Sequence, residues 1–382
     1  MKKSDTKSIK SNNTALLYEC LRNGALSRAQ LAQTSGLSKA TVTSIVGDLI
    51  AKGALVETGI AEGAGVGRPR TSLAIVADYR YAMGIALHRR RLSVCLVNLA
   101  YSIVDSRTFS TADFTSPASA LDALYHAATE MCAAHEIEKE KLIGIGVSAP
   151  GPLDYRKGII HTPPGLSLFH GFSVREHLER MSDLPVYLDN NATLLAMHER
   201  SLRRGTLQNW IFIVVTDGIG SAFFSDGRLY RGHGGYAGEL GHTSVEREGI
   251  PCACGNRGCL ERYIAMDSLK HHFNFADYHT VVDRAEAGDA AALEILDYIA
   301  QILSHALVNY VNLINPEAIV LYGELNYKSE LLFGKIEQRI RAHSTVAGIQ
   351  TVHVLPALMQ ENATLSSSAD AIFEAYFTQK LK

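Results

Sequence analysis

Three cysteines within eight residues constrain the fold of this chain more than any other feature of its sequence. Cys252, Cys254 and Cys259 lie in one short segment that also holds two glycines, and His242 lies ten positions before the first of them. Three thiolates and one imidazole suit Zn²⁺ in a closed, tetrahedral structural site. The alternative is a redox pair, but such pairs are usually Cys-x-x-Cys on a helix after a strand, and this segment is Cys-x-Cys in a loop. We therefore predict one structural Zn²⁺ ion per chain.

The other three cysteines, Cys20, Cys95 and Cys132, are scattered among apolar neighbours and do not form a disulfide framework. This usage predicts a cytoplasmic location. The N-terminus is polar and lacks the apolar core of a signal peptide. Apolar runs such as 210–215 have the length of a strand and are too short to cross a bilayer, so we expect no membrane association.

Charge is distributed unevenly along the chain. The formal net charge is −2, but residues 1–75 carry ten lysines and arginines against five aspartates and glutamates, and the remainder is acidic. A basic N-terminal region on an acidic body favours a polyanionic partner for that region alone. A solvated basic tail is the alternative that charge alone leaves open.

Residues 11–52 have the pattern of three short helices. Apolar positions within 13–21 predict the first, Ser27 can cap a second over 28–34, and Ser38 can cap a third after a glycine turn. The third helix has an apolar face made of Val42, Ile45, Val46, Leu49 and Ile50. A short helix, a glycine turn and an amphipathic helix form the helix-turn-helix pattern.

Two short strand patterns, 53–57 and 71–75, enclose a glycine-rich loop that carries Arg68 and Arg70. Two strands around a flexible loop predict a wing, so we interpret residues 1–75 as a winged helix-turn-helix DNA-binding domain. The two arginines could enter a narrow, A/T-rich minor groove. The alternative is a helical bundle that binds protein.

The outward face of the third helix is expected to read DNA. Thr43 and Ser44 lie opposite its apolar face, and Lys39 flanks its N-terminus. Small and hydroxyl side chains let a helix approach the major groove, where their donors reach base edges. Arg28, at the start of the second helix, could hold a phosphate of the DNA backbone.

Beyond residue 76, strand and helix patterns alternate in two similar halves. The expected strands are 81–87, 92–99, 108–109, 142–147, 186–188, 210–216, 221–224 and 318–321, and the expected helices are 117–135, 192–203, 291–313 and 363–377. Each half combines a β-hairpin with helices. This part of the chain is therefore predicted to be an α/β structure with two lobes.

The spacing Glu-x-Gly-His from residue 239, followed by Cys-x-Cys-Gly-x-x-Gly-Cys-x-Glu from residue 252, resembles the zinc signature of the ROK family of repressors, open reading frames and sugar kinases. The resemblance extends from about Ile9 to Ala371. It implies an actin/hexokinase-like (ribonuclease H-like) domain over 76–382, with lobe one at about 76–190 plus the C-terminal helix and lobe two at about 191–362. Members are either sugar kinases or sugar-responsive regulators with an added DNA-binding domain.

Three features of the family's kinases are altered in this chain. The loop Asp-x-Gly-Gly-Thr-Lys, which holds phosphate through backbone N–H groups, is replaced by His-Arg-Arg-Arg at 88–91. The family's catalytic aspartate aligns with Asn191, and a carboxamide cannot take the proton of a sugar hydroxyl. Asp189 has the right chemistry but lies two positions earlier, about 7 Å away on a strand. The second phosphate loop gains Asp217, which would repel phosphate, so it is better interpreted as a tight turn. We predict no kinase activity and no catalytic residue.

The resemblance also implies that a sugar site remains. The residues that match sugar-contacting positions of the family are Gly151, Asn190, Asn191, Glu239, His242 and Glu261. His242 could bind zinc through one ring nitrogen and donate to the sugar through the other. A solvated surface acid is the alternative for Glu239 and Glu261. Gly165 stands where family kinases often carry asparagine, which leaves the identity and phosphorylation state of the sugar open.

These features favour a sugar-responsive repressor that binds a palindromic operator in double-stranded DNA as a homodimer or homotetramer. A sugar or sugar phosphate between the lobes would shift the balance between two states of the protein. Two alternatives remain. One is a sugar kinase that retains a DNA-binding head, and the other is a regulator controlled by a protein partner.

Overall fold

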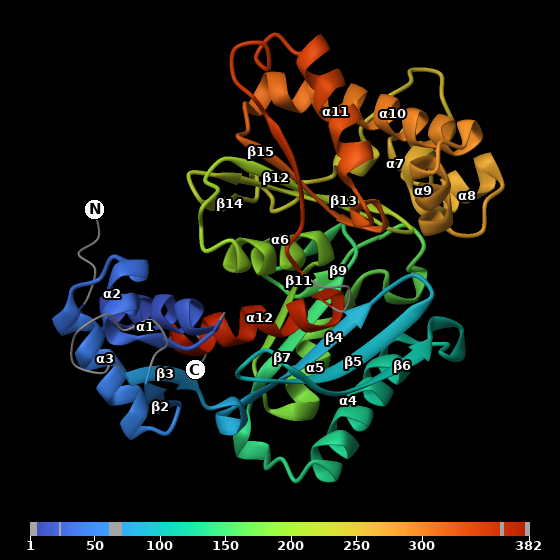
Figure 1. The fold of residues 1–382 in the computed structure, drawn as a ribbon. Coiled ribbons are helices and arrows are strands. Elements are labelled where there is room, and N and C mark those ends of the chain that lie inside the picture. Colours follow the sequence, from blue (N-terminus) through green and yellow to red (C-terminus); the bar gives the residue numbers. More distant parts are fainter. Residues whose placement is uncertain (1–5, 23, 61–70, 360–362, 379–382) are drawn as a thin grey trace. The chain divides into compact units, whose positions relative to one another are not determined.

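The computed structural model of the 382-residue chain describes residues 6–22, 24–60, 71–359 and 363–378 (Figure 1). The chain divides into two compact units. Unit 1 is Met1–Leu194 with Asn362–Lys382, and unit 2 is Leu195–Glu361. The chain passes from unit 1 to unit 2 within a single helix, α6 (Asn191–Leu202).

The N-terminal part of unit 1 holds three helices and a small sheet. The helices are α1 (Thr6–Arg22), α2 (Arg28–Ser35) and α3 (Lys39–Ala51), and the strands are β1 (Leu26–Ser27), β2 (Leu55–Ile60) and β3 (Thr71–Ile75), in the order β1-β3-β2. Ser27 and Ser38 cap α2 and α3 as expected, because their side-chain oxygens accept from backbone N–H groups of the first turn. Gly36 ends α2 at φ 70°, the left-handed conformation that glycine adopts most readily. Helix α1 begins earlier than expected because the residues before position 13 include no glycine or proline to stop it.

The main sheet of unit 1 has the strand order β11-β7-β4-β5-β6. Its strands are β4 (Tyr81–Leu87), β5 (Arg91–Asn98), β6 (Ile103–Ser110), β7 (Leu142–Ala149) and β11 (Val186–Asn190). The first three form an antiparallel meander, and β7 and β11 extend it in parallel with β4. A second, smaller sheet has the order β10-β9-β8 and is made of β8 (Leu153–Asp154), β9 (Ile159–Ile160) and β10 (Phe172–Ser173). The hairpins expected from the sequence are confirmed, and the strands are longer at β6, β7 and β11.

Helices cover both faces of this sheet. Helices α4 (Pro117–Ala134) and α5 (Val174–Ser182) lie on one face, and α12 (Ala363–Phe377) lies on the other (Figure 1). Successive residues of β4 alternate between the two cores: Met83 packs in the core that contains α4, and Ala82 in the core that contains α12. One face of the sheet is therefore covered by a helix from the far end of the chain.

A pair of glycines lets α12 lie directly on the strands. Gly84 of β4 stands opposite Gly146 of β7. A Cβ atom on Gly146 would lie 1.6 Å from the backbone oxygen of Ser368 in α12, and one on Gly84 would lie 2.5 Å from the Ser368 hydroxyl. Any side chain at either position would collide with the helix, so this close packing requires glycine.

The N-terminal region contacts the rest of unit 1 through buried side chains between α1 and α12. The Tyr18 ring stacks on Tyr101 and lies tilted against Phe377, with ring centroids 5.9 Å and 4.1 Å apart. Arg22 lies over the Tyr101 ring and forms an ion pair of 3.1 Å with Asp370, both side chains being less than a tenth exposed. One continuous apolar cluster includes residues of α1, α3, β5 and α12. The N-terminal helices, which we call the head, are therefore packed against α12 and the main sheet of unit 1.

Unit 2 has a main sheet of order β14-β13-β12-β15-β16. Its strands are β12 (Trp210–Val215), β13 (Ile219–Ser225), β14 (Arg228–Tyr230), β15 (Ala318–Gly323) and β16 (His353–Pro356), and its helices are α7 (Glu261–Ile264), α8 (Met266–Phe273), α9 (Tyr278–Glu286), α10 (Ala290–Ile314) and α11 (Glu330–His343). Among the described residues, only α10 has the length and apolar composition of a membrane span, and half of its most apolar window is buried in unit 2. It is a core helix, packed between α9 and α11.

Candidate metal centre and effector site

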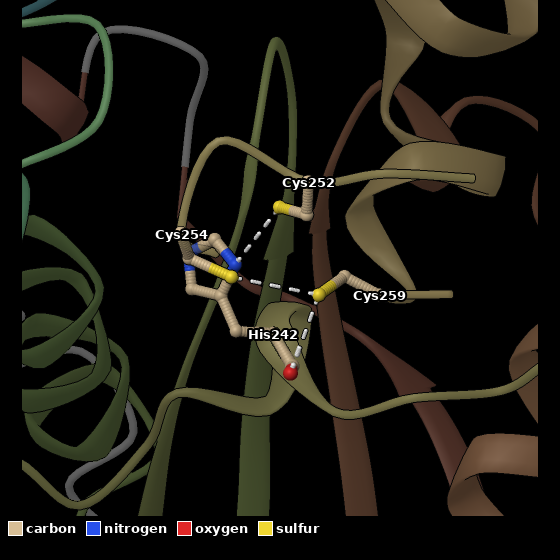
Figure 2. Close-up of side chains that lie close together, drawn as sticks. All are labelled: His242, Cys252, Cys254 and Cys259. Atoms are coloured by element: carbon tan, nitrogen blue, oxygen red, sulfur yellow. Dashed lines mark hydrogen bonds between the residues drawn. The ribbon is translucent and has the colours of Figure 1, made fainter. Parts of the chain in front are cut away.

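The predicted zinc ligands come together in unit 2. Figure 2 shows the side chains of His242, Cys252, Cys254 and Cys259 pointing toward one another. One potential ligand atom from each residue lies within 4.8 Å of the other three. The Nδ1 atom of His242 is 3.7 Å from the sulfur of Cys252, and the sulfurs of Cys254 and Cys259 are also 3.7 Å apart.

These distances fit a shared metal ion better than a disulfide. Two Zn–S bonds of about 2.3 Å at the tetrahedral angle place their sulfurs about 3.8 Å apart, whereas a disulfide would join them at about 2.05 Å. Burial, together with the thiols of Cys254 and Cys252, raises the pKa of Cys259 to about 12. Neighbouring thiols of this kind cannot all ionise at neutral pH unless a cation compensates their charge. The cluster is thus a set of donors that could bind a metal.

The backbone of the cysteine loop is shaped by hydrogen bonds and two glycines. The N–H of Cys252 donates to the carbonyl of Asn256, and that of Gly258 donates to the carbonyl of Ile250. Gly255 and Gly258 have φ of 92° and 71°, and a Cβ on Gly258 would lie 1.7 Å from the carbonyl of Glu246. These two positions therefore require glycine, as the sequence predicts for a loop that turns three sulfurs inward.

The predicted sugar residues of unit 2 are held against β13. Gly241 lies so close that a Cβ there would be 2.4 Å from the carbonyl of Ile219. The Glu261 carboxylate accepts a hydrogen bond of 3.0 Å from the Ile219 N–H. The pKa of Glu239 is raised, chiefly because water is displaced from around its carboxylate. The charge of His242 opposes this rise, and the charge of Glu261 adds to it. The structure thus brings Glu239, His242 and Glu261 into one electrostatic neighbourhood, and it gives Glu261 a structural bond that sequence reasoning missed.

The predicted sugar residues of unit 1 gather at the carboxyl ends of its parallel strands. Asn190 ends β11 and pairs in register with Ala149 of β7, two residues before Gly151. The side-chain oxygens of Asn190 and Asn191 both accept from the N–H of Ala192, at 2.8 Å each. These bonds orient both amides at the start of α6, and the amide NH₂ groups are the atoms that could donate to a hydroxyl.

Asp189, the carboxylate two positions before Asn191, is enclosed at the end of β11. Its side chain is buried, with 2% of its surface exposed. One oxygen accepts from the hydroxyl of Tyr187 at 3.0 Å, and the other accepts from the N–H of Asn190 at 2.8 Å. Both carboxylate oxygens are therefore engaged by neighbouring residues at the end of β11.

The predicted DNA-binding residues that the structure describes lie on the surface of the head. Lys39, Thr43 and Ser44 are exposed on α3, opposite its buried apolar face. Arg28 forms an ion pair of 2.7 Å with Glu57 of β2, so it would have to exchange this partner to hold a phosphate. Arg68 and Arg70 lie outside the described residues.

Comparisons with known proteins place the fold in a family. The two-lobed α/β architecture is shared with sugar kinases and regulators: a crystal structure of a ROK family transcriptional regulator, homologous to the E. coli Mlc protein, matches 98% of this chain and 99% of its own with a TM-score of 0.77 and 24% identity. A ROK family glucokinase from Streptomyces griseus, in complex with glucose and AMPPNP, matches 76% of this chain with a TM-score of 0.64 and 21% identity. The ROK family profile matches residues 82–371. The chain therefore belongs to the ROK family, and the expected actin/hexokinase-like fold is confirmed.

Curated relatives cover almost the entire chain. The xylose repressor of Bacillus subtilis (strain 168) is 27% identical over 96% of both chains. The N-acetylglucosamine repressor of Shigella flexneri is 27% identical over 94% of this chain and 92% of its own. The DNA-binding transcriptional repressor Mlc of Escherichia coli (strain K12) is 25% identical over 94% and 93%.

Proposed function

We propose that this protein is a cytoplasmic, sugar-responsive transcriptional repressor that binds operator DNA as a homo-oligomer. The observation that carries the proposal is that relatives named as sugar repressors match 94–96% of it, whereas the glucokinase matches 76% of it. The family profile begins at residue 82, which leaves the residues before it for a DNA-binding head. Effector binding would favour one of two states of the protein and so change its affinity for DNA.

The head, residues 1–75, is proposed to be a winged helix-turn-helix domain. Helices α2 and α3 are joined at Gly36, and β2 and β3 form an antiparallel hairpin. Helix α3 would enter the major groove with Lys39, Thr43 and Ser44, and the loop with Arg68 and Arg70 would reach the minor groove. Arg28 would contact the DNA backbone.

The metal is proposed to be one structural Zn²⁺ per chain, bound by His242, Cys252, Cys254 and Cys259. Three sulfurs and one nitrogen are the donor set that zinc prefers in a closed tetrahedral site. Nδ1 of His242 faces Cys252, which leaves Nε2 as the nitrogen that could donate to a sugar hydroxyl. The metal would stabilise the loop that leads into Glu261.

The protein is proposed to have no kinase activity. The chain has Asn191 where the family's kinases have their base, and a histidine and three arginines at 88–91 where they have a glycine loop for phosphate. Gly151, Asn190, Asn191, Glu239, His242 and Glu261 would instead hold the effector. A kinase with a DNA-binding head is the weaker hypothesis because it lacks both a base and a phosphate cradle.

The proposal is tested by isolating DNA that the purified protein selects from a randomised pool, and then adding pentoses, hexoses, amino sugars and their phosphates to the complex. We expect two half-sites about one or two helical turns apart, and release of the DNA by one class of sugar. Glu239→Ala should bind the operator and remain bound when that sugar is added, since the bound sugar loses a carboxylate partner worth about 1–3 kcal/mol. Glu239 is a sharper choice than Glu261, whose carboxylate also holds the Ile219 N–H.

Glu248→Ala is the matched control, because Glu248 lies in the same region with its side chain 82% exposed. It should release DNA at the wild-type sugar concentration. Selection of no DNA would contradict the proposal. Release by a protein from a cell extract, with no response to any sugar, would favour control by a protein partner instead.

A further inference from the structure

The turn between β4 and β5 is a fixed arginine turn. It consists of His88, Arg89 and Arg90, followed by Arg91 at the start of β5. The N–H of His88 donates to the carbonyl of Arg91 across the turn, and the N–H of Thr111 donates to the carbonyl of Arg90. The Thr111 hydroxyl donates to the carbonyl of His88 at 3.2 Å. The turn is thus tied both to itself and to the end of β6, which fixes where its side chains begin.

The arginine turn lies at the sheet edge that carries the proposed sugar residues of unit 1. Ala86 of β4 pairs with Ser148 of β7 in a parallel ladder, and Ser148 pairs with Asp189 of β11. Parallel strands end at the same edge of a sheet, and ligands of α/β folds bind outside those carboxyl ends. The turn therefore follows β4 as Gly151 follows β7 and as Asn190 ends β11.

Arg89 is directed onto the neighbouring loop. A Cβ atom on Gly165 would lie 2.8 Å from Cδ of Arg89 and 3.1 Å from both its Cγ and its Nε. Gly165 has φ of 78°, and the loop is closed by a hydrogen bond from the N–H of Leu166 to the carbonyl of Pro163. Arginine at 89 and glycine at 165 are therefore complementary, because the arginine occupies the space that any side chain at 165 would need.

Arg90 provides an internal contrast. It follows Arg89 directly and has the same charge, but it is exposed, whereas Arg89 is partly buried. A partly buried guanidinium has less water around it, and it binds a carboxylate or phosphate through two parallel, charge-assisted hydrogen bonds. A neutral sugar offers no group that matches this charge and geometry.

We propose that Arg89 recognises an anionic group of the effector, which is therefore a sugar phosphate or a sugar acid and not a neutral sugar. This inference rests on the proposed function, because it names the ligand class of the same site. The place occupied by a phosphate-binding glycine loop in the family's kinases would then be used to hold the anion of a regulatory ligand through a side chain.

The test measures ligand binding to the DNA-free protein by calorimetry, with matched sets of ligands. Each set contains a neutral sugar, its terminal phosphate and its uronic acid, for example glucose, glucose 6-phosphate and glucuronate, with equivalent sets for N-acetylglucosamine and xylose. In the wild type, one anionic member should bind about 10- to 100-fold more tightly than its neutral parent, the range expected for hydrogen bonds to a charged group. Arg89→Gln should abolish this difference, and Arg90→Gln should preserve it.

Further arms distinguish the two anions and guard against misfolding. A phosphate monoester gains its second charge near pH 6, so its affinity should rise between pH 5.5 and pH 7.5, whereas that of a uronic acid should not. Arg89→Lys keeps the charge without the planar fork and should recover part of the preference. Should Arg89→Gln fail to fold, the wild-type comparison of neutral and anionic partners still decides the question.

Two unfavourable outcomes have different meanings. If a neutral sugar binds as tightly as its anionic partners and still releases DNA, the role of Arg89 is refuted and the sugar-responsive repressor remains. If no member of any set binds and none releases DNA, both the inference and the proposed function are contradicted.

Discussion

The two units build their main sheets with the same strand order but stabilise and use them differently. In each, three antiparallel strands form a meander, and two further strands extend it in parallel, giving β11-β7-β4-β5-β6 in unit 1 and β16-β15-β12-β13-β14 in unit 2. In unit 1 the glycine pair Gly84 and Gly146 admits α12 onto the strands. In the matching ladder of unit 2, Phe212 stands opposite Val320, so bulky side chains stand where unit 1 has glycines.

The first hairpin turn of each main sheet shows the difference most clearly. In unit 1 this turn is cationic, with Arg89 lying on Gly165. In unit 2 it is the short turn 216–218, closed by a hydrogen bond between Thr216 and Gly218, and it carries the exposed Asp217. The N–H of Ile219, just beyond that turn, is held by Glu261. The two sheets therefore share a topology but differ in the charged residues of their loops, which determine what each unit can bind.

The largest difference between the units should appear on removal of the metal. Cys254→Ser should eliminate bound zinc and unfold the loop of unit 2 that contains Gly255 and Gly258, because structural zinc contributes about 10–16 kcal/mol of apparent binding free energy in small peptides. Elemental analysis checks the metal, and hydrogen exchange of the 244–264 backbone checks the loop. Cys132→Ser, in the α4 core of unit 1, should keep one zinc per chain. Wild-type protein purified without chelator and free of zinc would refute the assignment.

The next largest effect should come from the buried ion pair between α1 and α12 in unit 1. Asp370→Ala leaves Arg22 buried without its carboxylate partner, which should cost about 3–5 kcal/mol of unfolding free energy. Asp48→Ala breaks the pair of Lys10 and Asp48, whose side chains are 56% and 50% exposed, and should cost at most about 1 kcal/mol. Denaturant unfolding measures both. Equal costs would mean that the head is not held by this buried pair.

A smaller effect is expected from the glycine pair. Gly146→Ala places a Cβ against the backbone of Ser368, so α12 must move, at a cost of about 3 kcal/mol. Gly334 lies inside α11 of unit 2, and a Cβ atom added there would have nothing within 4 Å. Gly334→Ala should therefore be neutral or stabilise the protein by up to about 1 kcal/mol. Thermal or denaturant unfolding that shows no loss for Gly146→Ala would contradict the close packing.

The smallest effect should come from placing a carboxylate at position 191, where the kinases of the family are expected to have their base. Asn191→Asp supplies a carboxylate, but we expect the arginine turn to offer ATP phosphates no backbone cradle, so the variant should phosphorylate no hexose. A coupled assay with ATP and glucose, mannose, N-acetylglucosamine or allose measures this. Turnover near the typical kinase range of about 1–100 s⁻¹, in the variant or the wild type, would show that unit 1 has kept a phosphate site.

Much of the fold follows from local patterns in the sequence. Ser27 and Ser38 cap helices where expected, and α12 spans the predicted residues 363–377. The expected hairpins and the gathering of the cysteine cluster with His242 are also confirmed. The sequence patterns did not predict α5, α7, α8, α9 and α11 or the short strands. Helices α7 and α8 are only four and eight residues long, and such short segments carry too few turns for apolar periodicity to stand out.

By itself, the sequence determined the features that depend on spacing within a few residues. These are the helix caps, the glycine turns and the three closely spaced thiols. Tertiary structure alone decided which distant groups meet. Arg22 pairs with Asp370 across 348 positions, and the buried Glu199 accepts the backbone N–H of Leu358 across 159 positions. No local pattern encodes such partners, because a charge is buried only where the completed fold supplies its counterpart.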